Sequence, residues 1–185
     1  MYYVIQVFSG KEEETKKRFL KEITLPSFEY DIFVPKRKRM RKKEGKMFEV
    51  VETCFPGYLF IETDNIVELK KQLYNIKTLT KLLGIDKKHK DYIAPLRRDE
   101  EEMINVLLGK SGTARTIEIS HIYLKEGKDI VVIDGPLKGL EGKISNVNLH
   151  KRQATVLINL MGQLVETILG IDIIEEKIID NPTNS

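Results

Sequence analysis

The sequence predicts an α+β protein of two domains, an N-terminal α/β sandwich on an antiparallel sheet and a small C-terminal β-barrel of five strands. Two observations predict this fold class. Apolar strand-like segments alternate with amphipathic helical segments in the first 109 residues, which is typical of a split βαβ sandwich. Beyond residue 120, short β-branched runs are separated by Gly135, Gly139 and Gly142, and glycines at this density allow the tight turns of a strongly curved barrel.

The N-terminal elements begin with a strand at Tyr2–Phe8. A helix to about Ile23 follows, with Ser9 or Gly10 as N-cap, acids at residues 12–14 in its first turn, and Phe19, Leu20 and Ile23 on its buried face. The remaining expected elements are a strand at 28–34, a hairpin over 36–53 turning at Glu44-Gly45, a strand at 58–62, a helix from the cap Asp64 to Leu73, a strand at 79–85, and a helix at 100–108 capped by Asp99.

A glycine-rich and polar segment after residue 109 separates the two halves. It predicts an N-terminal domain at 1–109, a linker at 110–122, a barrel domain at 123–178 and a disordered tail at 179–185. The expected barrel strands lie near 128–133, 140–147, 152–159, 163–169 and 171–175.

Composition and charge exclude several classes of protein. No apolar run approaches the length of a membrane span and no signal-peptide pattern opens the chain, so we expect a cytoplasmic protein without a membrane partner. Cys54 is the only cysteine and is expected in the core. Since His89, His121 and His150 lie far apart and no phosphate-binding loop is present, we expect neither a metal, nor a cofactor, nor an enzyme.

The positive charge is concentrated in the N-terminal part. Residues 1–110 carry 23 Lys and Arg against 18 Asp and Glu, a net charge of +5, whereas residues 111–185 carry 8 against 10, a net charge of −2. Eight basic side chains and one acid lie between residues 36 and 46. On a two-stranded hairpin we expect them to project without neutralising neighbours and to attract phosphates. The residues expected to contact nucleic acid are Lys36, Arg37, Lys38, Arg39, Arg41, Lys42, Lys43 and Lys46, extended by Arg18 of the first helix. The alternative is a plain solvated loop or a sorting signal.

Four segments give the chain a resemblance to a known family. Residues 128–159 resemble the KOW motif, which occurs in an SH3-like barrel. The segments YVIQVFSG at 3–10, FPGYLFI at 55–61 and APL at 94–96 resemble the N-terminal domain of NusG. The resemblance extends from Tyr2 to about Glu176. It implies a monomeric transcription elongation and antitermination factor, and the basic hairpin would then lie near the nascent RNA hairpin or the non-template DNA strand.

The resemblance also implies partner surfaces. The N-terminal domain would dock on the clamp helices of the RNA polymerase β′ subunit through an apolar pocket. The residues that match this region are Phe8, Phe55, Pro56, Gly57 and Tyr58. Phe55, beside Pro56-Gly57, is expected at the interface, while core packing is an equal alternative for Phe8 and Tyr58. Ribosomal protein S10 or Rho would meet the barrel at Leu137, Leu140, Leu160 and Met161. Because Leu160 and Met161 are adjacent in an expected strand, one of them should be exposed.

A departure from the family pattern lies after the second helix, where Lys77 stands at a usual proline and Lys81 adds charge. It suggests a specialised paralogue similar to the LoaP-type antiterminators. A ribosome-associated or general RNA-binding KOW protein, and an RNA-processing enzyme, are the alternatives. A helical alternative state of the C-terminal domain is disfavoured by its β-branched residues, such as Val156 and Ile158.

Overall fold

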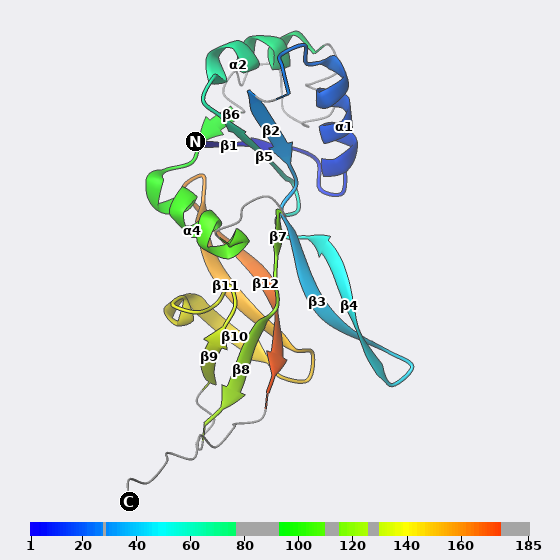
Figure 1. The fold of residues 1–185 in the computed structure, drawn as a ribbon, viewed down its shortest axis with the longest axis vertical. Coiled ribbons are helices and arrows are strands. Elements are labelled where there is room, and N and C mark those ends of the chain that lie inside the picture. The colour runs from blue at the N-terminus through cyan, green and yellow to red at the C-terminus, as the bar shows by residue number, and fades with distance from the viewer. Residues whose placement is uncertain (28, 77–92, 110–114, 126–129, 175–185) are drawn as a thin grey trace, which may run out of the picture.

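The computed structural model describes residues 1–27, 29–76, 93–109, 115–125 and 130–174. The N-terminal sheet and its helices lie at one end, the barrel lies at the other, and a long hairpin extends beside the barrel (Figure 1). The strand expected at 79–85 and the tail expected at 179–185 fall outside the described residues. None of the helices in the described ranges has the length and apolar character needed to cross a membrane.

The N-terminal sheet has four strands in the order β2-β5-β1-β6, and all neighbours are antiparallel. Three α-helices accompany it in the described part of the chain. The strands are β1 (Tyr2–Gln6), β2 (Tyr30–Phe33), β5 (Tyr58–Thr63) and β6 (Ile93–Pro95), and the helices are α1 (Glu12–Glu22), α2 (Ile66–Asn75) and α4 (Arg98–Leu108).

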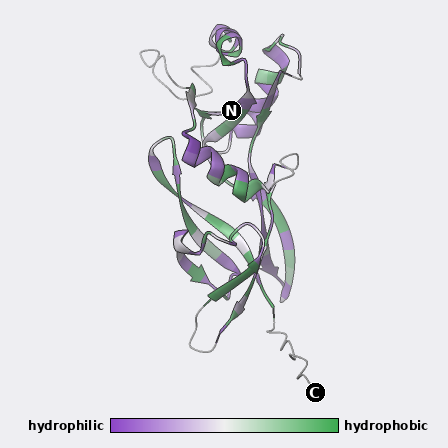
Figure 2. Ribbon diagram, turned by 60° about the vertical axis from the view of Figure 1, so that its left-hand side comes forward, coloured by the Kyte–Doolittle hydropathy of each residue, from purple (hydrophilic) through white to green (hydrophobic). Residues whose placement is uncertain are grey.

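Alternation along the strands gives this sheet two buried faces. Tyr3 and Ile5 of β1 belong to one apolar cluster with Phe19 of α1 and Leu69 of α2. The intervening Val4 belongs to a second cluster, which contains the apolar residues of α4 and of the barrel. Figure 2 shows that α4 is hydrophilic in its first half and hydrophobic toward its end. The helices α1 and α2 therefore cover one face of the sheet, and α4 together with the barrel completes the core of the other.

The helix starts differ from the sequence expectation. Lys11, Asn65 and Arg97 occupy the N-cap positions, in place of Ser9 or Gly10, Asp64 and Asp99. Gly10 has a φ of +83° and forms a turn before the first helix. Leu20, expected on the buried face of α1, is 45% exposed, whereas Phe19 and Ile23 are buried as expected.

The basic segment forms the expected hairpin of β3 (Lys36–Lys43) and β4 (Lys46–Thr53). Its turn residues Glu44 and Gly45 have φ values of +51° and +81°, the signature of a two-residue type I′ turn. A third strand, β7 (Thr116–Ile117), pairs in parallel with the base of β3. The segment expected as a linker at 110–122 therefore contains, in its described part, residues that pair with the N-terminal half.

The barrel sheet has five strands in the order β10-β11-β12-β8-β9. They are β8 (Ser120–Leu124), β9 (Ile130–Asp134), β10 (Ile144–Asn148), β11 (Gln153–Leu160) and β12 (Gln163–Ile173), and the 3-10 helix η1 (Glu141–Lys143) precedes β10. One strand expectation was wrong, because the strands expected at 163–169 and 171–175 are the single strand β12. β8 was not expected as a strand, and it begins at Ser120, in the last residues of the segment expected as a linker. β12 pairs with β11 along its first part and with β8 from Ile171 onward, so it joins both parts of the curled sheet.

Candidate functional site

The FPGY segment is a tight turn held against the start of α1. The Tyr58 amide donates to the Phe55 carbonyl at 3.2 Å, and Gly57 has a φ of +86°. Proline second and a positive-φ glycine third is the pattern of a type II turn. The Glu12 side chain is buried, and its Oε1 accepts from the amides of Gly57 at 2.6 Å and Gly10 at 3.0 Å. One carboxylate thus joins the two motifs that the sequence singled out.

The position of Phe55 differs from the expectation that it is displayed at an interface. Its side chain is only 1% exposed, and its ring centroid lies 5.8 Å from that of Phe60 in the cluster shared with the barrel. The turn directs the main chain so that Pro56 is exposed while Phe55 points into the core. Phe8 is 51% exposed, and Tyr58 is half-buried against the same cluster. Among the aromatic candidates, Phe8 is therefore the one that this state presents to solvent.

Polar contacts accompany the apolar contact between the two halves. The Thr167 hydroxyl of β12 donates to the Cys54 carbonyl at 3.0 Å and lies 3.4 Å from the Cys54 Sγ. The Gly162 amide donates to the Glu100 carboxylate of α4 at 2.9 Å. β12 also passes very close to β3, since a Cβ built on Gly170 would lie 2.5 Å from the Lys38 carbonyl oxygen. The barrel is therefore docked on the N-terminal domain by close and specific contacts.

Docking also explains the chemistry of Cys54. Burial raises the pKa of its thiol to about 11, although the hydrogen bond with Thr167 acts in the opposite direction. A thiol with so high a pKa is protonated at neutral pH and unreactive, as expected for a small core residue.

The proposed partner patch of the barrel is largely core in this state. Leu137 and Leu160 have no measurable exposure, while Leu140 and Met161 are partly buried. β11 ends at Leu160, and Met161 lies in the following turn with a φ of +54°. Of the adjacent residues Leu160 and Met161, one was expected to face outward. Met161 is the more exposed of the two, but it is still partly buried. In this state the cluster of the docked domains encloses Leu137 and Leu160, so half of the proposed patch is inaccessible to a partner.

The base of the basic hairpin is neutralised, in contrast to the expectation that neighbours would not pair with it. Lys36 contacts Glu13 at 2.6 Å, and Lys38 contacts Glu118 at 2.8 Å. Arg39 and Arg41 both pair with Glu52, Arg41 at 3.2 Å. The acids come from β4 and from segments distant in sequence, so the charge run alone did not reveal them.

Arg37 lies between the hairpin and the barrel. It donates to the Thr167 hydroxyl at 3.1 Å and approaches the Cys54 carbonyl at 3.5 Å. Burial lowers the pKa of its guanidinium. Arg37 therefore acts as an interdomain contact in this state.

The hairpin tip differs from its base. Lys42, Lys43 and Lys46 are exposed and form no ion pair with any residue that the structure describes. Arg18, expected to extend the patch, pairs with Glu22 at 2.9 Å. Within the described hairpin, the exposed lysines without an ion pair are thus at the tip, which Figure 1 shows away from the other elements.

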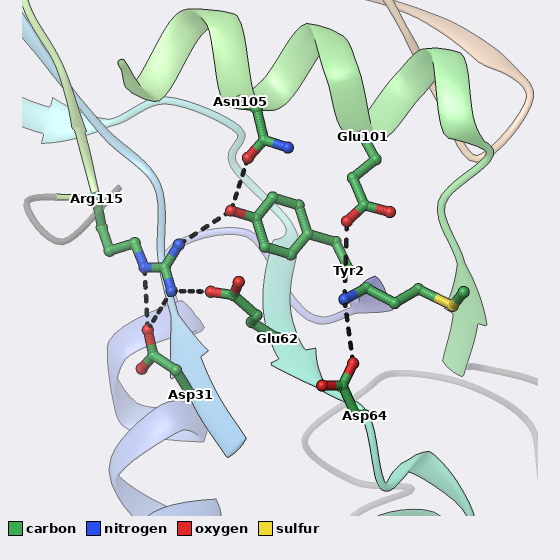
Figure 3. Close-up of polar contacts among 8 residues, drawn as sticks. Tyr2, Asp31, Glu62, Asp64, Glu101, Asn105 and Arg115 are labelled. Atoms are coloured by element: carbon green, nitrogen blue, oxygen red, sulfur yellow. Dashed lines mark hydrogen bonds and ion pairs between the residues drawn. The ribbon is translucent and has the colours of Figure 1, made fainter. Parts of the chain in front are cut away.

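Sequence reasoning missed a polar cluster around Arg115, which we call the Arg115 clasp (Arg115, Asp31, Glu62 and Tyr2; Figure 3). Arg115 donates to Asp31 at 2.7 Å and to the Tyr2 hydroxyl at 3.1 Å, and it also pairs with Glu62. Its guanidinium carbon lies 3.9 Å from the centroid of the Phe33 ring. The clasp fixes the chain just before β7 to the N-terminal sheet. A lone arginine in a polar segment carries no sequence signal for such a role.

The architecture defines a class of protein, in which an α/β sandwich with a basic hairpin precedes a KOW barrel. Comparison with known families specifies it further. The family described as "Transcription termination factor nusG" matches residues 1–105, and the KOW motif matches residues 126–159. The chain belongs to the NusG family of transcription termination and antitermination factors.

Individual relatives agree with this assignment. The chain is 26% identical over 178 residues to the transcription termination/antitermination protein NusG of Lactococcus lactis, covering 95% of this chain and 92% of the relative. It is 25% identical over 175 residues to the NusG protein of Streptococcus pyogenes, covering 93% and 92%. A solved structure described as "Domain interaction in Thermotoga maritima NusG" is similar in fold, with a TM-score of 0.51 and 18% identity over 91% of this chain and 92% of that one.

Proposed function

We propose that this chain is a bacterial elongation factor that promotes processive antitermination, binding RNA polymerase through its N-terminal domain and nucleic acid through its basic hairpin. Family membership supports the transcriptional role. The observation that carries the nucleic-acid part is the hairpin tip, where three lysines are exposed without an ion pair among the described residues. We keep the domain limits 1–109, 110–122 and 123–178 with a tail at 179–185, while β8 begins at Ser120, before the third of these segments. The β′ clamp helices remain the proposed docking partner.

Polymerase binding is proposed to require that the barrel leaves the second face of the N-terminal sheet. This proposal is supported by Phe55, which lies in the buried cluster that the sheet, α4 and the barrel share. The solved NusG structure from Thermotoga maritima is described as a domain interaction in that protein. In this chain, Phe8 and Pro56 remain accessible when the domains are docked and could make the first contact.

The barrel is proposed to bind a second protein, S10 or Rho, once it is released. In the docked state only Leu140 and Met161 of the four patch residues could contact this second protein, because Leu137 and Leu160 are core residues. A specialised role similar to that of LoaP is the remaining part of the proposal. Lys77 and Lys81, which suggested it, lie outside the described residues.

Pull-down of purified RNA polymerase tests the docking proposal. Phe8→Ala should weaken binding about 30-fold, the loss typical of a central aromatic anchor. Val67→Ala removes an even more exposed apolar side chain from α2 and should bind as wild type. Equal capture by wild type and Phe8→Ala, or sedimentation of the wild type with ribosomes without capture of polymerase, would contradict the docking proposal.

A further inference from the structure

One face of the hairpin tip combines an aromatic ring with three cations. In the antiparallel register Arg41 is opposite Phe48, and Lys43 is opposite Lys46. Directly opposed residues point to the same face, and so do residues two apart along a strand. Arg41, Lys43, Lys46 and Phe48 therefore share one face, which we call the tip face.

Phe48 is unusual on such a charged surface. Its side chain is 40% exposed, and it belongs to neither apolar cluster of the described residues. Lys46 lies about 7 Å along the strand from it, within reach of one nucleotide. An exposed aromatic ring surrounded by cations has the chemistry that single-stranded nucleic acid needs, since a base can stack on the ring while lysines hold the phosphates.

The other face of the hairpin lacks this combination. It carries Lys42 opposite Met47, Met40 opposite Glu49, and Lys38 opposite Val51. Glu49 approaches Lys38 at 3.6 Å, which reduces the positive charge of that face. On the tip face the nearest acid of the paired strands is Glu52, which is engaged by Arg39 and Arg41 at the base. The tight Glu44-Gly45 turn sets the two strands in a fixed register, so the ring and the lysines are arranged before any ligand arrives.

We infer that the tip face binds the unpaired nucleotides of a single-stranded nucleic acid, with a base stacked on Phe48 and adjacent phosphates held by Lys43 and Lys46. The inference rests on the proposed nucleic-acid contact of the hairpin and narrows it. A duplex presents phosphates to the lysines but no free base face to the ring. Phe48 should therefore matter for single strands only.

Fluorescence anisotropy with the full chain tests the inference. The probes are a uridine RNA strand and a thymidine DNA strand of about 12 nucleotides, within the usual site size, and a blunt DNA duplex. Phe48→Ala should weaken single-strand binding about 5- to 150-fold and leave duplex binding within about 2-fold. Phe48→Trp, which keeps an aromatic ring at this position, should bind the single strands as tightly as wild type. Val51→Ala removes a 56% exposed apolar side chain from the other face and should have no effect.

The outcomes separate the inference from the proposed function. A variant with Lys42, Lys43 and Lys46 all changed to Gln should weaken binding to every probe. It should also reduce the slope of the salt dependence on single strands by about 1.4, because two of the three lysines lie on the tip face. If that variant weakens binding while Phe48→Ala does not, or if Phe48→Ala weakens duplex and single strand equally, the inference is overturned and the nucleic-acid contact stands. If the lysine variant binds as wild type, the nucleic-acid contact itself fails.

Discussion

Replacing Gly170 with alanine should separate the barrel from the N-terminal domain. The new Cβ would lie 2.5 Å from the Lys38 carbonyl oxygen and 3.1 Å from the Arg39 Cα, and backbone atoms cannot move aside as a flexible side chain can. Gly170 does not have a positive φ, so alanine introduces no strain into β12 itself. Gly142 is a matched control, because it also lacks a positive φ and a Cβ there would meet nothing within 4 Å.

The size of the effect follows from overpacking, which typically costs 1–3 kcal/mol, or about 5- to 150-fold in an equilibrium. Cys54 reports the opening, because its Sγ lies 3.4 Å from Thr167 on the barrel and its thiol is buried. When opening is fast, the rate of thiol alkylation is proportional to the open population. Gly170→Ala should therefore be alkylated about 5- to 150-fold faster than wild type, and Gly142→Ala at the wild-type rate.

Urea distinguishes domain separation from unfolding. Separation exposes less surface, so the logarithm of the alkylation rate should rise with low concentrations of urea much less steeply than global unfolding requires. An unchanged alkylation rate in Gly170→Ala would refute the reasoning about the close contact. A faster rate with the full urea dependence of global unfolding would show that alanine destabilises the fold and does not open the interface.

Three further predictions concern the contacts that hold this arrangement. Glu12→Ala leaves the Gly57 amide of the FPGY turn and the Gly10 amide before α1 without their acceptor and should lower the free energy of unfolding in urea by about 2–4 kcal/mol, whereas the exposed neighbour Glu14→Ala should not change it measurably. Arg115→Lys loses the forked contact with Asp31 and Glu62, so hydrogen exchange of the Lys36 amide, which donates to the Arg115 carbonyl, should accelerate, while exposed Arg98→Lys should not change it. The folded state holds the pKa of the Cys54 thiol at about 11, above its ordinary 9.0, so the contribution of the protonated thiol to the free energy of unfolding is complete below about pH 9 and is lost toward pH 11. Over this range the free energy of unfolding of the wild type should fall by about 2–3 kcal/mol more than that of Cys54→Ala. Equal losses would contradict the burial of the thiol.

The parts of the fold that depend on local chemistry could be predicted from the sequence. The hairpin and its Glu44-Gly45 turn were confirmed, because a two-residue turn and alternating strands are encoded within a few residues of one another. β8 was missed because SHIYL follows a polar segment that is typical of a linker, and one of its two strand partners, β12, is distant in sequence.

The candidate site was less predictable because long-range contacts determine which side chains are free. Phe55 is buried by a turn and a domain contact that its neighbours in sequence do not specify. The ion pairs of Lys36 and Lys38 come from Glu13 and Glu118. Charge density therefore indicated the correct hairpin, whereas only the folded chain shows that its free cations are at the tip.

The Arg115 clasp limits how far the barrel can travel. While β7 stays paired with β3, only Glu118 and Ile119 separate Ile117 from the first barrel strand, a span of at most about 11 Å. Such a short tether keeps the local concentration of the barrel near its docking face in the millimolar range or above. A free partner can compete for that face only when the ratio of its concentration to its dissociation constant exceeds the same ratio for the tethered barrel. Breaking the clasp would lengthen the tether and lower this concentration. One arginine thus sets the threshold that a competing partner must overcome.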